Sequence, residues 1–243
     1  MKKAVLGVVS ALVFASSLIS ISAQQKESAA PPLTAAERER HTEEKHAKPI
    51  LDALALKDAD KEAKLRPMLA EHFKALNEWH EQNDAKIKAL WTEFDKARSA
   101  KSDAGADAAL EKIDGAYASF KPEHEKFDGE LGTILTPEQI ETVKDAITIN
   151  KVKITFNAYG EIFPGITAEH KAFILKNLKA AREEAIDAGS MPEKSAFFKK
   201  YKIKIEAYLT AHGFDVKESY RVFVAKQKAE QKAKKAAQTG EKK

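Results

Sequence analysis

Two long stretches of the chain repeat apolar residues at alternating intervals of four and three, the spacing of a helix face packed against a partner. The first contains Leu69, Phe73, Leu76, His80, Asn83, Ile87, Leu90 and Phe94, and the second contains Leu110, Ile113, Tyr117, Phe120, His124, Phe127, Leu131 and Ile134. A loop is expected between them at residues 99–106. The pattern therefore predicts an antiparallel helical hairpin over residues 47–134, in which Phe94 faces Leu110 and Phe73 faces Leu131.

The same pairing places the polar residues of the hairpin in one layer, with His80 opposite His124 and Asn83 one turn away. In one interpretation these side chains hydrogen-bond to each other and fix the register, as single polar residues do in coiled coils. The other is a ligand or metal site that adds Asp84 or Glu123, because two histidines and a carboxylate can hold a metal ion. The spacing within each helix does not demand a metal, so the sequence favours the first interpretation, with no metal or cofactor. Burial should lower the pKa of both histidines.

Helix start signals recur along the rest of the chain. In a capping box, the side chain of the residue before the helix accepts a hydrogen bond from the backbone N–H three residues later. The Glu or Gln at that later position accepts a hydrogen bond from the backbone N–H of the first residue in return. Four such pairs are Thr34 with Glu37, Thr136 with Gln139, Ser190 with Glu193, and Asp215 with Glu218. Gly189 and Gly213 indicate helix ends, because glycine adopts the left-handed conformation without strain. Helices are therefore expected at 58–98, 107–133, 137–150, 167–188, 191–212 and 216–235.

Two segments leave the local structure open. Pro122 can kink or restart the second hairpin helix, because proline removes a helix hydrogen bond, and a restart would shift the pairing register. Residues 151–159 alternate polar and apolar side chains with β-branched types, which fits either an extended segment or a distorted helix. The predicted fold class is nonetheless all-α, with the long antiparallel hairpin followed by a C-terminal helical bundle at residues 135–224.

The two ends of the chain differ from this body. Residues 1–23 have a basic start, an apolar stretch and small residues at the end, as in a secretory signal peptide, so we expect a periplasmic or secreted protein. Residues 24–46 fit a linker or a loose helix. The chain has no cysteine, so it would fold in an oxidising compartment without a disulfide. No transmembrane segment is expected after signal cleavage.

Residues 225–243 form a basic tail with seven lysines and two glutamates. The positive charge is concentrated in this tail and is not spread along a folded face, which argues against nucleic acid as a partner. The sequence contains no Gly-rich phosphate loop, serine elbow or closely spaced histidine pair, and its carboxylates alternate with lysines as on solvated helix faces. We therefore expect no catalytic residues and a protein that is not an enzyme.

Three blocks, at residues 145–159, 181–190 and 198–209, differ in character from the hairpin. Together they resemble an uncharacterised family of exported bacterial proteins, classed as a domain of unknown function, over roughly residues 48–222. The resemblance implies a link to sugar binding and no known activity. The chain is thus expected to be an exported, non-enzymatic binding protein, with carbohydrate or another protein as its partner and an oligomeric state that the sequence does not set.

The same blocks supply the candidate binding residues. A tight turn at Gly189 returns the next helix antiparallel to the previous one, so polar side chains on both helices could converge with the 151–159 segment. The predicted ligand-binding residues are Asn157, Tyr159, Arg182, Asp187, Tyr201 and Lys202. The alternative for Arg182 is a buried structural ion pair.

A second, shorter similarity suggests a different function. Leu135-Thr-Pro-Glu-Gln139 is similar to the Leu-Thr-x-x-Gln signature of small helical periplasmic stress proteins, and Ile166-Thr-Ala-Glu-His170 is a degraded second copy. The same residues would also start any capped helix. This resemblance implies, as the alternative function, a periplasmic chaperone or stress sensor that uses an exposed apolar face of the hairpin.

Overall fold

A computed structural model describes residues 34–240, and every regular element within that range is helical. The elements are α1 (Ala35–Thr42), a π-helix (Glu43–Ala47), α2 (Lys48–Leu54), α3 (Ala59–Ser99), α4 (Asp103–Tyr117), α5 (Lys121–Ile134), α6 (Pro137–Ile147), α7 (Lys151–Ile162), α8 (Ala168–Ala185), α9 (Met191–Ala211) and α10 (Val216–Gly240). The all-α prediction is confirmed. The predicted signal peptide lies outside the described residues. None of the helices in residues 34–240 combines the length and apolar character needed to cross a bilayer.

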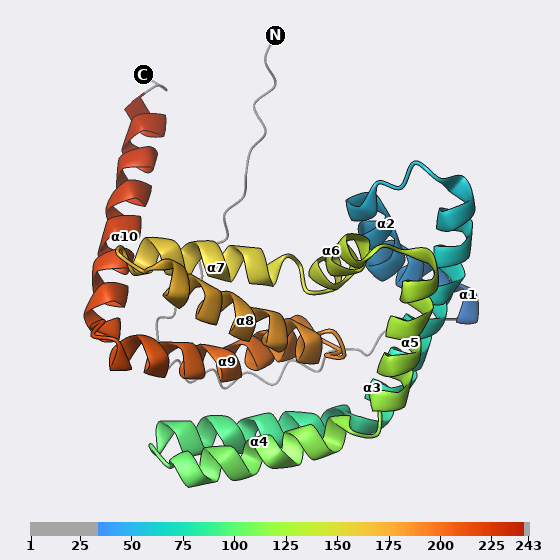
Figure 1. Ribbon diagram of the computed structural model, residues 1–243, viewed down its shortest axis with the longest axis horizontal. Helices are drawn as coiled ribbons and strands as arrows, with labels where there is room; N and C mark the ends of the chain where they lie inside the picture. The colour runs from blue at the N-terminus through green and yellow to red at the C-terminus, as the bar shows by residue number, and fades with distance from the viewer. Residues whose placement is uncertain (1–33, 241–243) are drawn as a thin grey trace.

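Helix α3 and the pair α4 and α5 run antiparallel, joined by a loop shorter than expected (Figure 1). Asp58 caps α3 by accepting the backbone N–H of Lys61 at 3.0 Å. Ser102 likewise accepts the N–H of Gly105 at 3.2 Å, so α4 begins at Asp103, within the segment expected to be a loop. The serine at the N-cap position is a helix start signal that apolar periodicity does not detect.

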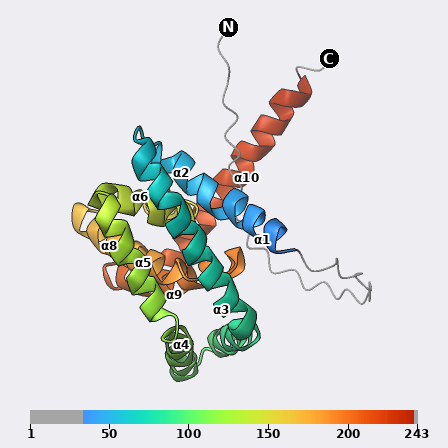
Figure 2. The same cartoon turned by 90° about the vertical axis from the view of Figure 1, so that its right-hand side faces the viewer.

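The second arm breaks between Tyr117 and Lys121, and α5 restarts with Pro122 in its first turn, where the missing N–H removes no helix bond. Helix α3 is bent at the same level as this break, so both arms of the hairpin change direction at one place (Figures 1 and 2). The indole N–H of Trp79 donates to Ser119 Oγ at 2.9 Å and joins the arms at the bend. Residues 79–84 of α3 and 117–120 of the second arm are called the elbow.

The break shifts the pairing register. Toward the α3–α4 loop, Lys112 pairs with Glu93 at 2.9 Å, close to the expected alignment. Beyond the elbow, Lys126 pairs with Glu71 at 2.8 Å, where the unbroken register would place it opposite Glu78. The predicted pairing of His80 with His124 is therefore wrong, because three non-helical residues slide α5 along α3.

The bend divides the apolar interior into two clusters. The first lies between the α3–α4 half of the hairpin and helices α7, α8 and α9, and includes Phe94, Ile113, Ile174 and Phe197. The second lies between α2, the first half of α3, α5 and α6, and includes Ile50, Leu65, Leu131 and Val143. Trp79 packs against both clusters. The elbow is thus where the two halves of the protein meet.

The segment whose structure the sequence left open is helical. Ile149 and Asn150 adopt positive φ angles of 54° and 51°, which end α6 and turn the chain into α7. Val152, Tyr159 and Ile162 form the buried face of α7. Helical packing against α8 and α10 therefore overrides the β-branched composition of the segment.

Helix α10 extends past its last contacts with the body, which Tyr220 and Phe223 make (Figure 1). From Ala225 onward the sequence offers no apolar side chain larger than alanine. Deleting residues 226–243 should therefore change the melting temperature, measured by circular dichroism, by less than about 2 °C. A drop of more than about 5 °C, roughly 1–2 kcal/mol in a domain of this size, would show that this segment stabilises the body.

Candidate functional site

Two His-x-x-x-Asp motifs, one on each arm of the hairpin, face the turn between α8 and α9. The first is His80 with Asp84 on α3, and the second is His124 with Asp128 on α5. Residues four apart on a helix lie on one face, so each aspartate can reach its own histidine. Figure 1 shows the α8–α9 turn pointing at the elbow, and Asp187 in that turn contacts both histidines.

His80 is held on three sides. Its Nε2 lies 2.7 Å from the backbone oxygen of Asp187, and its Nδ1 lies 2.6 Å from Asp84 Oδ1. The ring rests against Gly189, where a Cβ would come within 2.7 Å of it. Gly189 does not have a positive φ angle, so the predicted reason for this glycine is wrong. It is needed for the close approach of the His80 ring. Gly213, with φ of 88°, does end its helix as predicted.

His124 lies between two carboxylates. Its Nδ1 is 3.0 Å from both carboxylate oxygens of Asp187, and its Nε2 is 3.5 Å from Asp128 Oδ2. Hydrogen bonds to Asp128 and Asp187 raise the pKa of His124 to about 10, although burial opposes the charged form. The expectation that burial would lower this pKa is wrong. Two carboxylates, one supplied by a distant part of the chain, outweigh desolvation.

The charged contacts continue from His124 along α5 and across two further helices. Asp128 accepts the Lys144 ammonium at 2.8 Å, and Lys144 also donates to Glu183 at 2.6 Å. Burial opposes ionisation of Asp128, but hydrogen bonds from His124 and Lys144 lower its pKa to about 2. The buried Arg182 then joins Glu183 at 3.0 Å, and it also donates to Asp145 at 2.8 Å and Glu141 at 2.6 Å. The network therefore ties α5, α6 and α8 together.

A second group of buried polar side chains lies on α9 beside His80. Glu193 accepts the backbone N–H of Gly189 at 2.8 Å and the hydroxyl of Tyr117. The Lys194 ammonium donates to the backbone oxygen of Ala188 at 2.9 Å, and burial lowers the pKa of Lys194 to about 8. The Ser190 hydroxyl caps α9 by accepting the backbone N–H of Glu193, as predicted. The Glu193 carboxylate, however, accepts the backbone N–H of Gly189 and not that of Ser190, so the second bond of the predicted capping box is not formed.

The predicted ligand-binding residues are divided among several places. Arg182 is an ion-pair partner of α6 residues, which matches the structural alternative raised for it. Asp187 lies in the α8–α9 turn, where its carboxylate bonds to the His124 ring. Tyr201 donates its hydroxyl to Glu184 at 2.5 Å.

The other three predicted residues lie on the α7 and α9 side of the molecule. Asn157 is exposed on α7, and Tyr159 is buried with its ring stacked on Phe163. The Lys202 ammonium lies 3.8 Å from Glu206. None of the six predicted residues lines the groove or the smaller cavity between α3 and α5.

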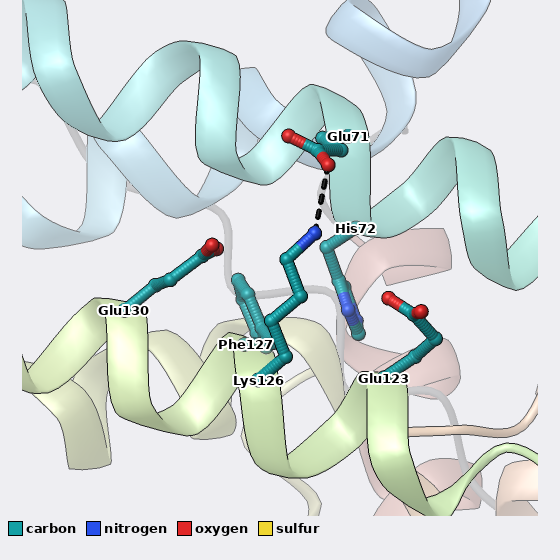
Figure 3. A pocket seen from close by; sticks show the side chains of 6 residues that line it. All are labelled: Glu71, His72, Glu123, Lys126, Phe127 and Glu130. Carbon is teal, nitrogen blue, oxygen red and sulfur yellow. Dashed lines mark hydrogen bonds and ion pairs between the residues drawn. The ribbon is translucent and has the colours of Figure 1, made fainter.

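An open groove lies instead between the first half of α3 and the end of α5. Its volume is about 590 Å³, and it is lined by Ala63, Lys64, Pro67, Met68, Glu71, Glu130, Thr133 and Ile134. A smaller cavity of about 10 Å³ adjoins it and shares Glu71 and Glu130 (Figure 3). The remaining residues around this cavity are His72, Glu123, Lys126 and Phe127.

His72 is the buried polar residue of this second site. Only 6 % of the residue is exposed, its ring stacks on Phe127 with 3.8 Å between centroids, and Nε2 has no hydrogen-bond partner among the described residues. Burial lowers the pKa of His72 to about 3, so the ring is neutral near pH 7. The sequence carries a signal for this burial, because His72 lies three residues after Leu69 and shares its buried helix face.

The residues near the elbow whose contacts the sequence did not predict are Asp128, Lys144, Glu183 and Glu193. The repeat of His-x-x-x-Asp on both arms was visible in the sequence and could have identified Asp128. Lys144 and Glu183 resemble the other surface charges of amphipathic helices, so sequence spacing carries no signal for them.

Comparison with known families gives one match, and comparison with curated proteins gives none. The family described as "Protein of unknown function (DUF3826)" matches residues 40–229, which is most of the chain. The expected membership of an uncharacterised family is thereby confirmed, and the chain belongs to the DUF3826 family of proteins of unknown function.

Proposed function

We propose that this chain is an exported, non-enzymatic binding protein that holds a carbohydrate in the groove between α3 and α5. The observation that carries the proposal is the buried His72, whose Nε2 lacks a partner in the described residues, beside a groove of ligand-binding size. A buried nitrogen without a hydrogen bond is costly, so a ligand that supplies one gains affinity. Export is inferred from residues 1–23.

The lining of the groove is suited to a hydroxyl-rich molecule. Glu71 and Glu130 of the groove and Glu123 of the adjoining cavity offer carboxylate acceptors, and the Lys64 ammonium offers donors. A neutral imidazole can complete a bond with a hydroxyl group, which both donates and accepts. Pro67, Met68 and Ile134 add aliphatic surface for the C–H face of a sugar ring.

The ionisable side chains outside the groove whose pKa values are shifted also favour a binding protein over an enzyme. His124 is held by two carboxylates, and Lys194 donates to backbone oxygens. The hydrogen-bonding atoms of these side chains already have partners within the protein, which favours a structural role for them. The large apolar side chains that are exposed in residues 34–240 are Ile149, Ile154, Met191, Val222 and Val224, which lie outside the hairpin. Nothing in the hairpin therefore favours a chaperone role.

The test is a glycan array with the mature protein, followed by calorimetric titration of the glycans that bind. Thr133→Trp fills the groove and should weaken binding by at least about tenfold, or 1.4 kcal/mol. Thr92→Trp is the matched control. Thr92 is also an exposed helical threonine whose hydroxyl bonds to a backbone oxygen of the preceding turn, but it lies outside the groove.

The expected result is glycan binding that Thr133→Trp reduces and Thr92→Trp does not. Binding that survives Thr133→Trp would place the site elsewhere and overturn the proposal. So would an array without bound glycans, and suppression of client aggregation by the same preparation would then favour the chaperone alternative.

A further inference from the structure

Three potential metal ligands from two separate helices meet at the elbow. The His80 ring nitrogen and the carboxylate oxygens of Asp84 and Glu193 all lie within 4.8 Å of one another. His80 and Asp84 lie on α3, whereas Glu193 lies on α9. Docking of the α8–α9 turn therefore creates this group of atoms.

The surroundings of His80 fix which nitrogen faces the carboxylates. A backbone oxygen can only accept a hydrogen bond, so the contact of Nε2 with Asp187 requires a hydrogen on Nε2. In the neutral ring, Nδ1 then carries a lone pair, and it faces Asp84 Oδ1 at 2.6 Å. At this distance a proton joins the two atoms, and a metal ion that binds here displaces that proton as the exposed Asp84 side chain shifts outward. A histidine that ligates a metal typically donates its other N–H to a carbonyl or carboxylate, as His80 does here.

The charge balance distinguishes this group from its neighbour on α5. His124, Asp128 and Glu183 also come within the same distance of one another, but the Lys144 ammonium already bonds both of those carboxylates. Asp84 and Glu193 have no lysine or arginine partner among the ion pairs of the described residues. Two carboxylates beside one imidazole provide the charge that a divalent cation would neutralise.

We propose that His80, Asp84 and Glu193 bind a divalent transition-metal ion of the Zn²⁺ class. One imidazole nitrogen and two carboxylate oxygens leave a fourth position open, as in zinc sites with three protein ligands. The side chain of Asp84 is 69 % exposed, so an ion can enter from solvent. Glu193 is held by Gly189 N–H and the Tyr117 hydroxyl, and each of its oxygens keeps a second lone pair for the ion.

The test uses untagged mature protein that has been treated with a chelator and dialysed. Zn²⁺ is titrated by calorimetry, and Co²⁺ is titrated by visible absorption, which reports its coordination directly. We expect one ion per chain. Asp84→Asn and Glu193→Gln should each weaken Zn²⁺ binding by at least about tenfold, and His80→Gln should abolish the Co²⁺ bands.

Asp128→Asn is the matched control, because it changes the equivalent aspartate of the second motif, where Lys144 takes the cation position. It should leave Zn²⁺ affinity unchanged. Asp84 is exposed, so Asp84→Asn keeps the fold and isolates the loss of a ligand. The proposal is overturned if wild type binds no metal, or if Asp84→Asn binds like wild type. Thr133→Trp should bind Zn²⁺ normally, so the test is independent of the carbohydrate proposal.

Discussion

Replacing Gly189 with alanine should lower the free energy of unfolding by about 2–3 kcal/mol. The added Cβ would lie 2.7 Å from two atoms of the His80 ring, closer than real contacts of this kind. Either the ring or the α8–α9 turn must then move, and the 2.7 Å bond from His80 to Asp187 is weakened with it. The melting temperature should fall by roughly 5–10 °C for a domain of this size.

Gly132→Ala provides the control for this substitution. Gly132 also lies in the hairpin, but a Cβ there would meet nothing within 4 Å. Alanine is favoured over glycine inside a helix, so Gly132→Ala should stabilise the protein by about 0.5–1 kcal/mol. Equal effects of the two substitutions would show that contact with His80 is not what requires glycine at position 189.

The stabilising contribution of His124 should fall by roughly 1.5 kcal/mol between pH 6.5 and pH 8. Its folded-state pKa of about 10 lies above the value of about 6.5 in the unfolded chain. The folded state therefore binds more protons between these values. The stabilisation is complete below pH 6.5 and is lost as the pH rises toward 10.

Other groups oppose the effect of His124 in this window. Burial lowers the pKa of Lys194 to about 8, so its contribution increases stability as the pH rises above 8 and opposes that of His124. Burial lowers the pKa of His72 to about 3 and that of His46 to about 4, so the contributions of both rings increase stability as the pH rises through 6.5. The wild-type slope is therefore smaller than His124 alone would give, and a variant of His124 is needed to separate its contribution.

Urea unfolding at several pH values measures this slope. The stability of wild type relative to His124→Gln should fall by roughly 1.5 kcal/mol from pH 6.5 to pH 8, whatever the variant does to overall stability. His41→Gln, which changes an exposed histidine on α1, should keep the wild-type slope. The same slope in wild type and His124→Gln would mean that the ring does not carry its proton between Asp187 and Asp128.

Local signals were sufficient to predict most of the helices. The four-and-three spacing placed Leu69, Phe73 and Phe94 on the buried face of α3, and all three are buried. Thr136 and Gln139 form the predicted capping box at the start of α6, and Pro122 restarts α5. These features depend on neighbours within about one helical turn, so the sequence determines them directly.

The candidate sites depended on contacts that local patterns do not encode. The three-residue break before α5 changed which residues face each other across the hairpin, so that Lys126 pairs with Glu71. Asp187 reaches both histidines only because the α8–α9 turn docks at the elbow.

The sequence by itself determined an all-helical chain with a hairpin and the positions of its caps, because helix periodicity and capping act over a few residues. The tertiary structure decided the protonation of His124, the need for Gly189 and the assembly of His80, Asp84 and Glu193. A pKa, a close approach and a ligand set each depend on distances between groups that lie far apart in the chain. Those distances are set only when the two halves of the protein pack together at the elbow.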